Sequence, residues 1–118
     1  MIDRYTRPRM SAIWDLQHKY EIWLEVELQA CAAFERGGQI PRGTSARIRK
    51  KAKIDVPRIA EIEKVTKHDV IAFLESLMDS VGPEHRFLHM GLTSSDIVDT
   101  SLAVQRTEAL DLILEDLN

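Results

Sequence analysis

Residues 11–36 read SAIWDLQHKYEIWLEVELQACAAFER, and this stretch decides the fold class. Apolar side chains recur in it every three or four residues with charged residues between them, as on one face of an α-helix. Ser11 is a suitable N-cap, and Gly37-Gly38 ends the pattern. The sequence therefore predicts one long helix that begins after Ser11. Its apolar face comprises Ile13, Leu16, Tyr20, Trp23, Leu24, Leu28, Cys31 and Phe34.

Helical spacing continues along the rest of the chain, interrupted by clusters of Gly and Pro. No alternating strand pattern with a hairpin turn occurs, so the sequence predicts an all-α fold. We expect a short helix to Lys51 capped by Thr44 or Ser45, and a connector over 84–92. A third helix is expected from Asp55-Pro57, with Ile59, Ile62 and Val65 facing inward. A fourth is expected from Thr66 or Lys67 to Gly82-Pro83, and a last one from Ser94 or Ser95 onward.

Composition narrows the class of protein. The 118 residues are 44% hydrophobic and 30% charged, which is typical of one globular domain rather than a disordered chain. A net charge of -3 gives no overall basic field for nucleic acid or anionic lipid. We expect no membrane span, because no apolar run approaches the roughly 20 residues that one needs. A single cysteine, Cys31, excludes an intramolecular disulfide and favours a reducing, cytoplasmic location; we also expect no secretory signal.

The last predicted helix has apolar residues on more than one face near its end, namely Leu110, Leu112, Ile113, Leu114 and Leu117. Such a helix needs neighbours on several sides. We interpret it as a helix cut off in mid-course, which predicts self-association of the exposed end. The alternative is a natural C-terminal helix that dimerises.

Simple metal and nucleophile sites are not indicated. His85 and His89 are four residues apart but fall in the predicted connector, and no Cys pair or HExxH motif is present. Cys31 lies on an apolar helix face, where a thiol is usually buried and inert. Residues 36–53 carry seven basic side chains and no acid. Without aromatic residues among them to stack on bases, a solvated surface is favoured over a nucleic-acid contact.

Three polar segments are candidate binding elements. Lys67-His68-Asp69 places a histidine between a cation and a carboxylate at a helix start, where it serves either as a capping cluster or as a site. Thr93-Ser94-Ser95 begins the last helix after Gly91. Its free N–H groups and hydroxyls are suited to binding a carboxylate or phosphate, but an ordinary helix cap would have the same sequence. Arg4-Tyr5 suits a phosphate or a base, or is a mobile tail.

In combination these segments resemble the N-terminal part of the adenylosuccinate lyase family, in the fumarase/aspartase superfamily. The resemblance runs from Met1 to the end of the chain. It is carried by RYTRP at 4–8, Trp14, KYEIWLEVE at 19–27, KHDVIAF at 67–73 and HMGLTSSDIVDT at 89–100. The Thr93–Asp96 block is general to the superfamily, whereas the Arg4-Tyr5 and Lys67–Asp69 blocks point to the adenylosuccinate-cleaving members.

The resemblance implies an L-aspartase-like N-terminal helical domain at 1–93, followed at 94–118 by the start of a long helix of the central bundle. It implies a C–N lyase of purine and AMP biosynthesis. Family members cleave adenylosuccinate to AMP and fumarate, and the succinyl-carboxamide intermediate SAICAR to AICAR and fumarate, by β-elimination without a metal or other cofactor. They are homotetramers whose active sites each combine three subunits.

By position, the family's nucleotide-binding pair matches Arg4 and Tyr5. A second substrate-contacting block matches Lys67, His68 and Asp69, and the residues that hold the substrate carboxylate match Thr93 and Ser94. His68 and His89 are the candidate catalytic residues within this chain. The family's general-acid histidine and serine base lie in regions beyond residue 118, so we expect the chain alone to be inactive. The alternatives are a superfamily lyase of the argininosuccinate type and a small all-α binding module.

Overall fold

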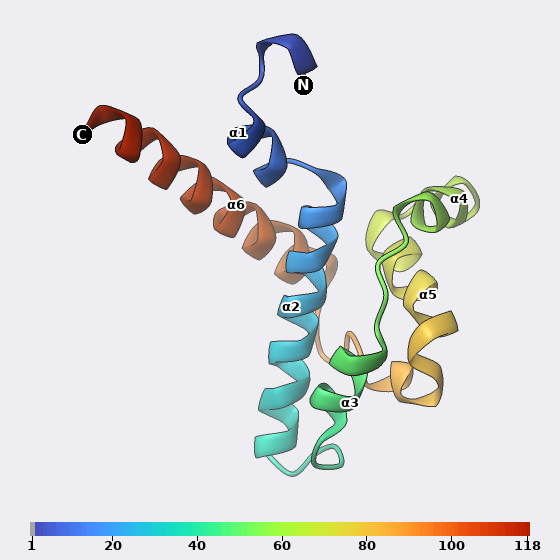
Figure 1. Cartoon of the computed structure of the whole chain (residues 1–118). Helices are drawn as coiled ribbons and strands as arrows, with labels where there is room; N and C mark the ends of the chain where they lie inside the picture. Colours follow the sequence, from blue (N-terminus) through green and yellow to red (C-terminus); the bar gives the residue numbers. More distant parts are fainter. Residues whose placement is uncertain (1) are drawn as a thin grey trace.

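The computed structural model describes residues 2–118 and contains helices but no strand in that range, which confirms the all-α prediction. The elements are η1 (Asp3–Tyr5), α1 (Pro8–Ile13), α2 (Leu16–Arg36), α3 (Thr44–Lys51), α4 (Val56–Thr66), α5 (Asp69–Val81), η2 (Gly82–Phe87) and α6 (Ser94–Leu117). α2 lies in the middle, with α6 crossing one side of it, α3 beside its C-terminal half, and α4 and α5 packed against each other on the opposite side (Figure 1).

An aromatic cluster holds α2 to α5. Tyr20 stacks on Phe73 with ring centroids 5.8 Å apart, and Trp23 meets both rings edge-on at 5.2 and 5.5 Å. The Trp23 indole N–H also donates to Ser101 Oγ of α6 at 2.8 Å. Because Trp23 contacts both α5 and α6, it holds the N-terminal halves of these two helices against the same part of α2.

The predicted single helix after Ser11 is wrong, because the chain forms two helices there. Ser11 lies inside α1, which begins at Pro8, and the N-cap of α2 is Asp15. Proline at the first helical position explains the early start. The carbonyl of Ile13 accepts a hydrogen bond from Gln105 Nε2 of α6 at 2.7 Å. This tertiary bond satisfies the end of α1 and allows the chain to turn before α2.

α3 has the predicted range but a different cap. Its N-cap is Gly43, with φ of 79°, and not Thr44 or Ser45. The Glu35 carboxylate of α2 accepts hydrogen bonds from the backbone N–H groups of Gly43 and Ser45. A side chain eight residues before the turn therefore replaces the local hydroxyl cap.

The predicted start of α5 at Thr66 or Lys67 is also wrong. Thr66 ends α4, Lys67 adopts a left-handed conformation, and extended His68 is the N-cap of α5. Val65, expected to face inward, is 83% exposed. At 100° per residue it lies about 120° around the helix from buried Ile59, whereas Ile62 lies about 60° from it.

α6 begins at Ser94 as predicted, with Thr93 as N-cap. Its buried residues are Ile97, Ser101, Gln105 and Ala109, of which Ser101 and Gln105 are polar. Most of the large apolar residues of its C-terminal half are exposed: Leu110, Ile113, Leu114 and Leu117. The predicted apolar surface near the end of the helix is therefore present and uncovered in the single chain.

Candidate functional site

The structure brings two of the three predicted segments together at the N-terminal ends of α5 and α6. His68 Nε2 lies 3.3 Å from Ser94 Oγ, although the two residues are 26 positions apart in sequence. His68 is the N-cap of α5, and Ser94 is the first residue of α6. The positive ends of two helices therefore meet beside an imidazole and a hydroxyl, an arrangement suited to an anion.

The hydrogen bonds of His68 determine its tautomer. Nδ1 accepts the backbone N–H of Ile71 at 3.3 Å, so the proton of a neutral ring resides on Nε2. The Nε2–H group then donates to Ser94 Oγ. With its oxygen occupied as an acceptor, the Ser94 hydroxyl directs its own proton away from His68. The pair thus presents a donor to a bound carboxylate.

Lys67 and Asp69 flank His68 at the N-terminal end of α5. Asp69 Oδ1 lies 3.7 Å from His68 Nδ1 and accepts the Val70 N–H at 2.7 Å, which suits a carboxylate in the first turn of a helix. Lys67 is exposed and has φ of 54°. Both expected roles of the Lys67–Asp69 block, helix capping and a place at the site, are compatible with this geometry.

The first turn of α6 is accessible. Thr93, Ser95 and Asp96 are exposed and Ser94 is half-buried. The Asp96 carboxylate accepts the backbone N–H of Thr93 at 2.7 Å, as in a capping box. Within residues 2–118, the first turn of α6 is therefore open to a carboxylate.

His89 is held by a residue that the sequence patterns did not single out, the buried Glu27 of α2. One Glu27 oxygen lies 2.6 Å from His89 Nδ1, and the other accepts the His89 backbone N–H at 2.7 Å. Among residues 2–118, His89 and Lys67 are the two non-glycine residues with positive φ. Such conformations cost free energy and tend to occur at functional sites. A glutamate at a position facing the apolar core is the signal that marks Glu27 in the sequence.

Arg4 and Tyr5 do not join His68 and Ser94 within one chain. The Arg4 guanidinium lies 4.8 Å from the centroid of the exposed Tyr5 ring. Tyr5 lines the same surface pocket as Leu112 and Ile113, which are near the C-terminal end of α6. Leu112 is 18 residues beyond Ser94, or about 27 Å along the helix axis.

Comparisons with known proteins address the family. The sequence is 47% identical to adenylosuccinate lyases of Bacillus subtilis, Aquifex aeolicus and Staphylococcus saprophyticus, over 99%, 100% and 99% of the chain. The fold matches a fumarate lyase from Mesorhizobium sp. BNC1 with a TM-score of 0.79 and 25% identity over 88% of the chain. The sequence and fold of the chain fit the fumarase/aspartase superfamily. No family model matches the sequence.

The match to these superfamily members covers only part of each relative. The chain spans 27–28% of the length of the three adenylosuccinate lyases and 25% of the fumarate lyase. The relatives named support the adenylosuccinate lyase resemblance, and nothing in the fold favours the argininosuccinate-type alternative or the small binding module.

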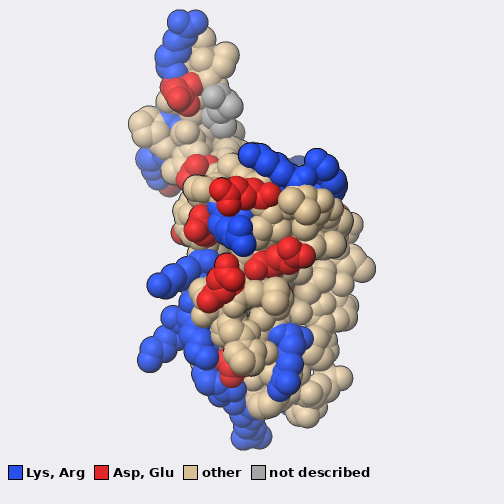
Figure 2. All heavy atoms as spheres, turned by 90° about the vertical axis from the view of Figure 1, so that its right-hand side faces the viewer, with Lys and Arg blue, Asp and Glu red and all other residues tan. Residues whose placement is uncertain are grey.

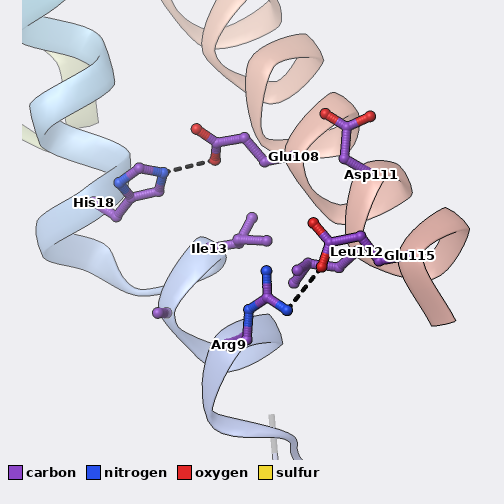
Figure 3. A pocket seen from close by; sticks show the side chains of 8 residues that line it. Arg9, Ile13, His18, Glu108, Asp111, Leu112 and Glu115 are labelled. Carbon is purple, nitrogen blue, oxygen red and sulfur yellow. Dashed lines mark hydrogen bonds and ion pairs between the residues drawn. The ribbon is translucent and has the colours of Figure 1, made fainter.

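A surface pocket with a volume of about 500 Å³ lies elsewhere, between α1, α2 and α6 (Figure 3). None of the predicted site residues lines it. Its charged groups are paired across the helices: His18 Nε2 lies 2.7 Å from Glu108, and Arg9 donates to Glu115 at 2.8 Å. We assign these pairs to the attachment of α6 and retain the open ends of α5 and α6 as the candidate site.

The basic stretch at 36–53 is partly neutralised in this fold. Arg47 and Lys51 approach Glu84, and Arg49 pairs with Glu25 at 2.7 Å. Acidic side chains lie among the basic ones on the face in Figure 2, although Lys and Arg predominate toward its lower end. Within residues 2–118 no cluster of three metal-ligating side chains is found, and no helix has the length and apolarity to cross a membrane.

Cys31 is buried as expected, with 1% exposure, and its Sγ lies 3.2 Å from the carbonyl of Phe87. Burial, and then the charges of Glu27 and Glu35, raise the pKa of the thiol from 9.0 to about 11. Between pH 9 and about 11, the Cys31 thiol therefore keeps its proton in the folded state and loses it in the unfolded state.

This difference predicts a pH dependence of stability. The free energy of unfolding should fall as the pH rises from 9 to about 11, because the unfolded thiol ionises first. Cys31→Ala removes this contribution but leaves the other groups that titrate in this range. Denaturant titrations of both proteins at intervals from pH 8 to 11 measure it. Parallel pH curves for the two proteins would contradict the assignment.

Proposed function

We propose that this chain is the N-terminal part of a longer C–N lyase that cleaves adenylosuccinate to AMP and fumarate, and SAICAR to AICAR and fumarate. The observation that carries the proposal is the His68–Ser94 contact at two helix N-termini, in a chain 47% identical to adenylosuccinate lyases. A succinyl carboxylate bound there accepts the Ser94 O–H and the free N–H groups of the first turn of α6.

The proposed reaction is a β-elimination. A base removes the proton beside the succinyl carboxylate, the electron pair resides in an aci-carboxylate, and the C–N bond then breaks as an acid protonates the departing nitrogen. The aci-carboxylate carries one more negative charge than the carboxylate of the substrate. Donors at the N-terminus of α6 therefore stabilise the aci-carboxylate more than the ground state, and this difference lowers the barrier. By the family resemblance, the acid histidine and base serine come from beyond residue 118. We therefore propose that residues 1–118 alone are inactive.

The separation within one chain supports an assembly of several copies. Leu112, which lines the same pocket as Tyr5, lies about 27 Å along α6 from Ser94. Arg4 and Tyr5 can then bind the nucleotide phosphate only in a site that they share with another subunit. We propose a homotetramer in which residues 1–93 form the N-terminal domain and 94–118 enter a central bundle that covers the exposed apolar residues of α6. We place the enzyme in the cytoplasm, where a free thiol such as Cys31 is usual.

An assay with the longer protein tests this function. The protein should release fumarate and AMP from adenylosuccinate and sediment as four chains, whereas residues 1–118 alone should give no turnover. Argininosuccinate supplied in parallel controls for the substrate class. A longer protein that cleaves argininosuccinate and leaves adenylosuccinate intact would overturn the proposal.

A further inference from the structure

Glu27 is a fully buried charged side chain, with 0% exposure, to which the proposed mechanism gives no task. A carboxylate in a protein interior is costly unless hydrogen bonds and an opposite charge compensate it. Both Glu27 oxygens are used, and both on the same residue, His89, which is 62 positions away in sequence. Among residues 2–118, His89 is therefore the hydrogen-bond partner of both oxygens of this carboxylate.

The contact is part of a longer attachment of the segment before α6 to one face of α2. Cys31, one turn beyond Glu27, contacts the carbonyl of Phe87. Phe34, two turns beyond Glu27, lies 3.4 Å from the position that a Cβ on Gly91 would occupy. Phe87 and Gly91 flank His89, and Thr93 caps α6 four residues after it. An apolar residue at position 27 would bury against this segment as well, so packing alone does not explain the carboxylate.

What the carboxylate adds is control of the His89 ring and backbone. The bond to the His89 N–H stabilises a φ of 61°, which is unfavourable for a residue with a Cβ. The bond at Nδ1 places the ring proton there when Glu27 is ionised, so that Nε2 is the unprotonated atom. The His89 side chain is 24% exposed, so the ring extends from the buried carboxylate toward the surface.

We propose that Glu27 is a positioning residue that fixes His89 with its proton on Nδ1 and presents Nε2 to the substrate of the lyase. This proposal rests on the proposed function. A carboxylate behind an imidazole holds the ring in one tautomer and one orientation, as in other enzymes that use a carboxylate–histidine pair. Nε2 can then exchange a hydrogen bond or a proton with a ligand that binds near the start of α6.

Nitrogen NMR of the 118-residue chain with ¹⁵N-labelled histidine tests the geometry without an assay. In the wild type, His89 should show a protonated Nδ1 and an unprotonated Nε2, and Glu27→Gln should remove this preference. A His89 ring protonated on Nε2 would overturn the proposal, as would a spectrum unchanged by Glu27→Gln. The wild-type spectrum decides the tautomer even where the Gln variant folds poorly.

Kinetics of the longer enzyme test the consequence. Glu27→Gln should lower kcat for adenylosuccinate by roughly 10²-fold, with a smaller change in KM. Glu35→Gln is the matched control: Glu35 is also a glutamate of α2 whose carboxylate accepts two backbone N–H groups from another segment, but it contacts no histidine. We expect Glu35→Gln to change stability and to leave kcat near the wild-type value. Equal kcat losses in the two variants would overturn the proposal.

A double variant separates positioning from structure. In a His89→Gln background, Glu27→Gln should cause no further loss of kcat, because the residue through which Glu27 acts is already absent. A second, multiplicative loss would show that Glu27 acts elsewhere and would overturn the proposal. Absence of adenylosuccinate cleavage in the wild-type enzyme would instead refute the proposed function, and the NMR result would still decide whether Glu27 fixes His89.

Discussion

Ser94→Ala lowers kcat/KM for adenylosuccinate by roughly 10²–10³-fold in the longer enzyme, the loss typical of removing one preorganised donor from a developing oxyanion. Ser94 begins α6, and its oxygen accepts from His68 Nε2, so its proton is available to the substrate carboxylate. The substitution removes this donor and leaves the helix intact, because Thr93 is the N-cap.

Ser95→Ala is the control for the Ser94 experiment. Ser95 is the adjacent hydroxyl on the same first turn, is exposed, and has no role in the proposed site. Steady-state kinetics and thermal unfolding of both variants measure the comparison. An unchanged kcat/KM for Ser94→Ala, or equal losses for the two serines, would reject the assigned role of Ser94.

His68→Asn lowers kcat/KM by roughly 10²-fold and leaves the melting temperature nearly unchanged. His68 has two functions in the structure, since Nδ1 caps α5 through the Ile71 N–H and Nε2 contacts Ser94. Asparagine retains the first, because its side-chain oxygen is a good N-cap acceptor, and it loses the second.

His68→Ala removes both functions, so a comparison with His68→Asn separates the cap from the contact with Ser94. It should lose activity as the Asn variant does and in addition lose about 0.5–2 kcal/mol of stability with the cap. Kinetics and denaturant unfolding of the two variants provide the test. Full activity of His68→Asn would show that His68 is only a helix cap.

Much of the fold is predictable from the sequence because local patterns determine it. Gly37-Gly38 and Asp55-Pro57 mark helix ends that the structure confirms. Two of the missed features depend on contacts between distant segments. The break after Ile13 needs Gln105 of α6, and the cap of α3 needs Glu35 of α2. No local pattern contains that information.

The candidate site shows the same division. A helix N-terminus rich in hydroxyls is visible in the sequence at 93–95, and a histidine beside a carboxylate at 68–69. That these two segments meet depends on the packing of α5 and α6 around Trp23. Helical spacing places Glu27 on the apolar face of α2, four residues after Trp23, but it does not show that His89, 62 positions away, is its partner.

The central claim is that the paired N-terminal ends of α5 and α6 hold a carboxylate of the substrate. A crystal structure of the longer enzyme with fumarate tests it most directly. We predict one fumarate carboxylate within about 3 Å of Ser94 Oγ, at the first-turn N–H groups of α6. Fumarate bound at another place in the enzyme, with no carboxylate beside Ser94, would contradict it.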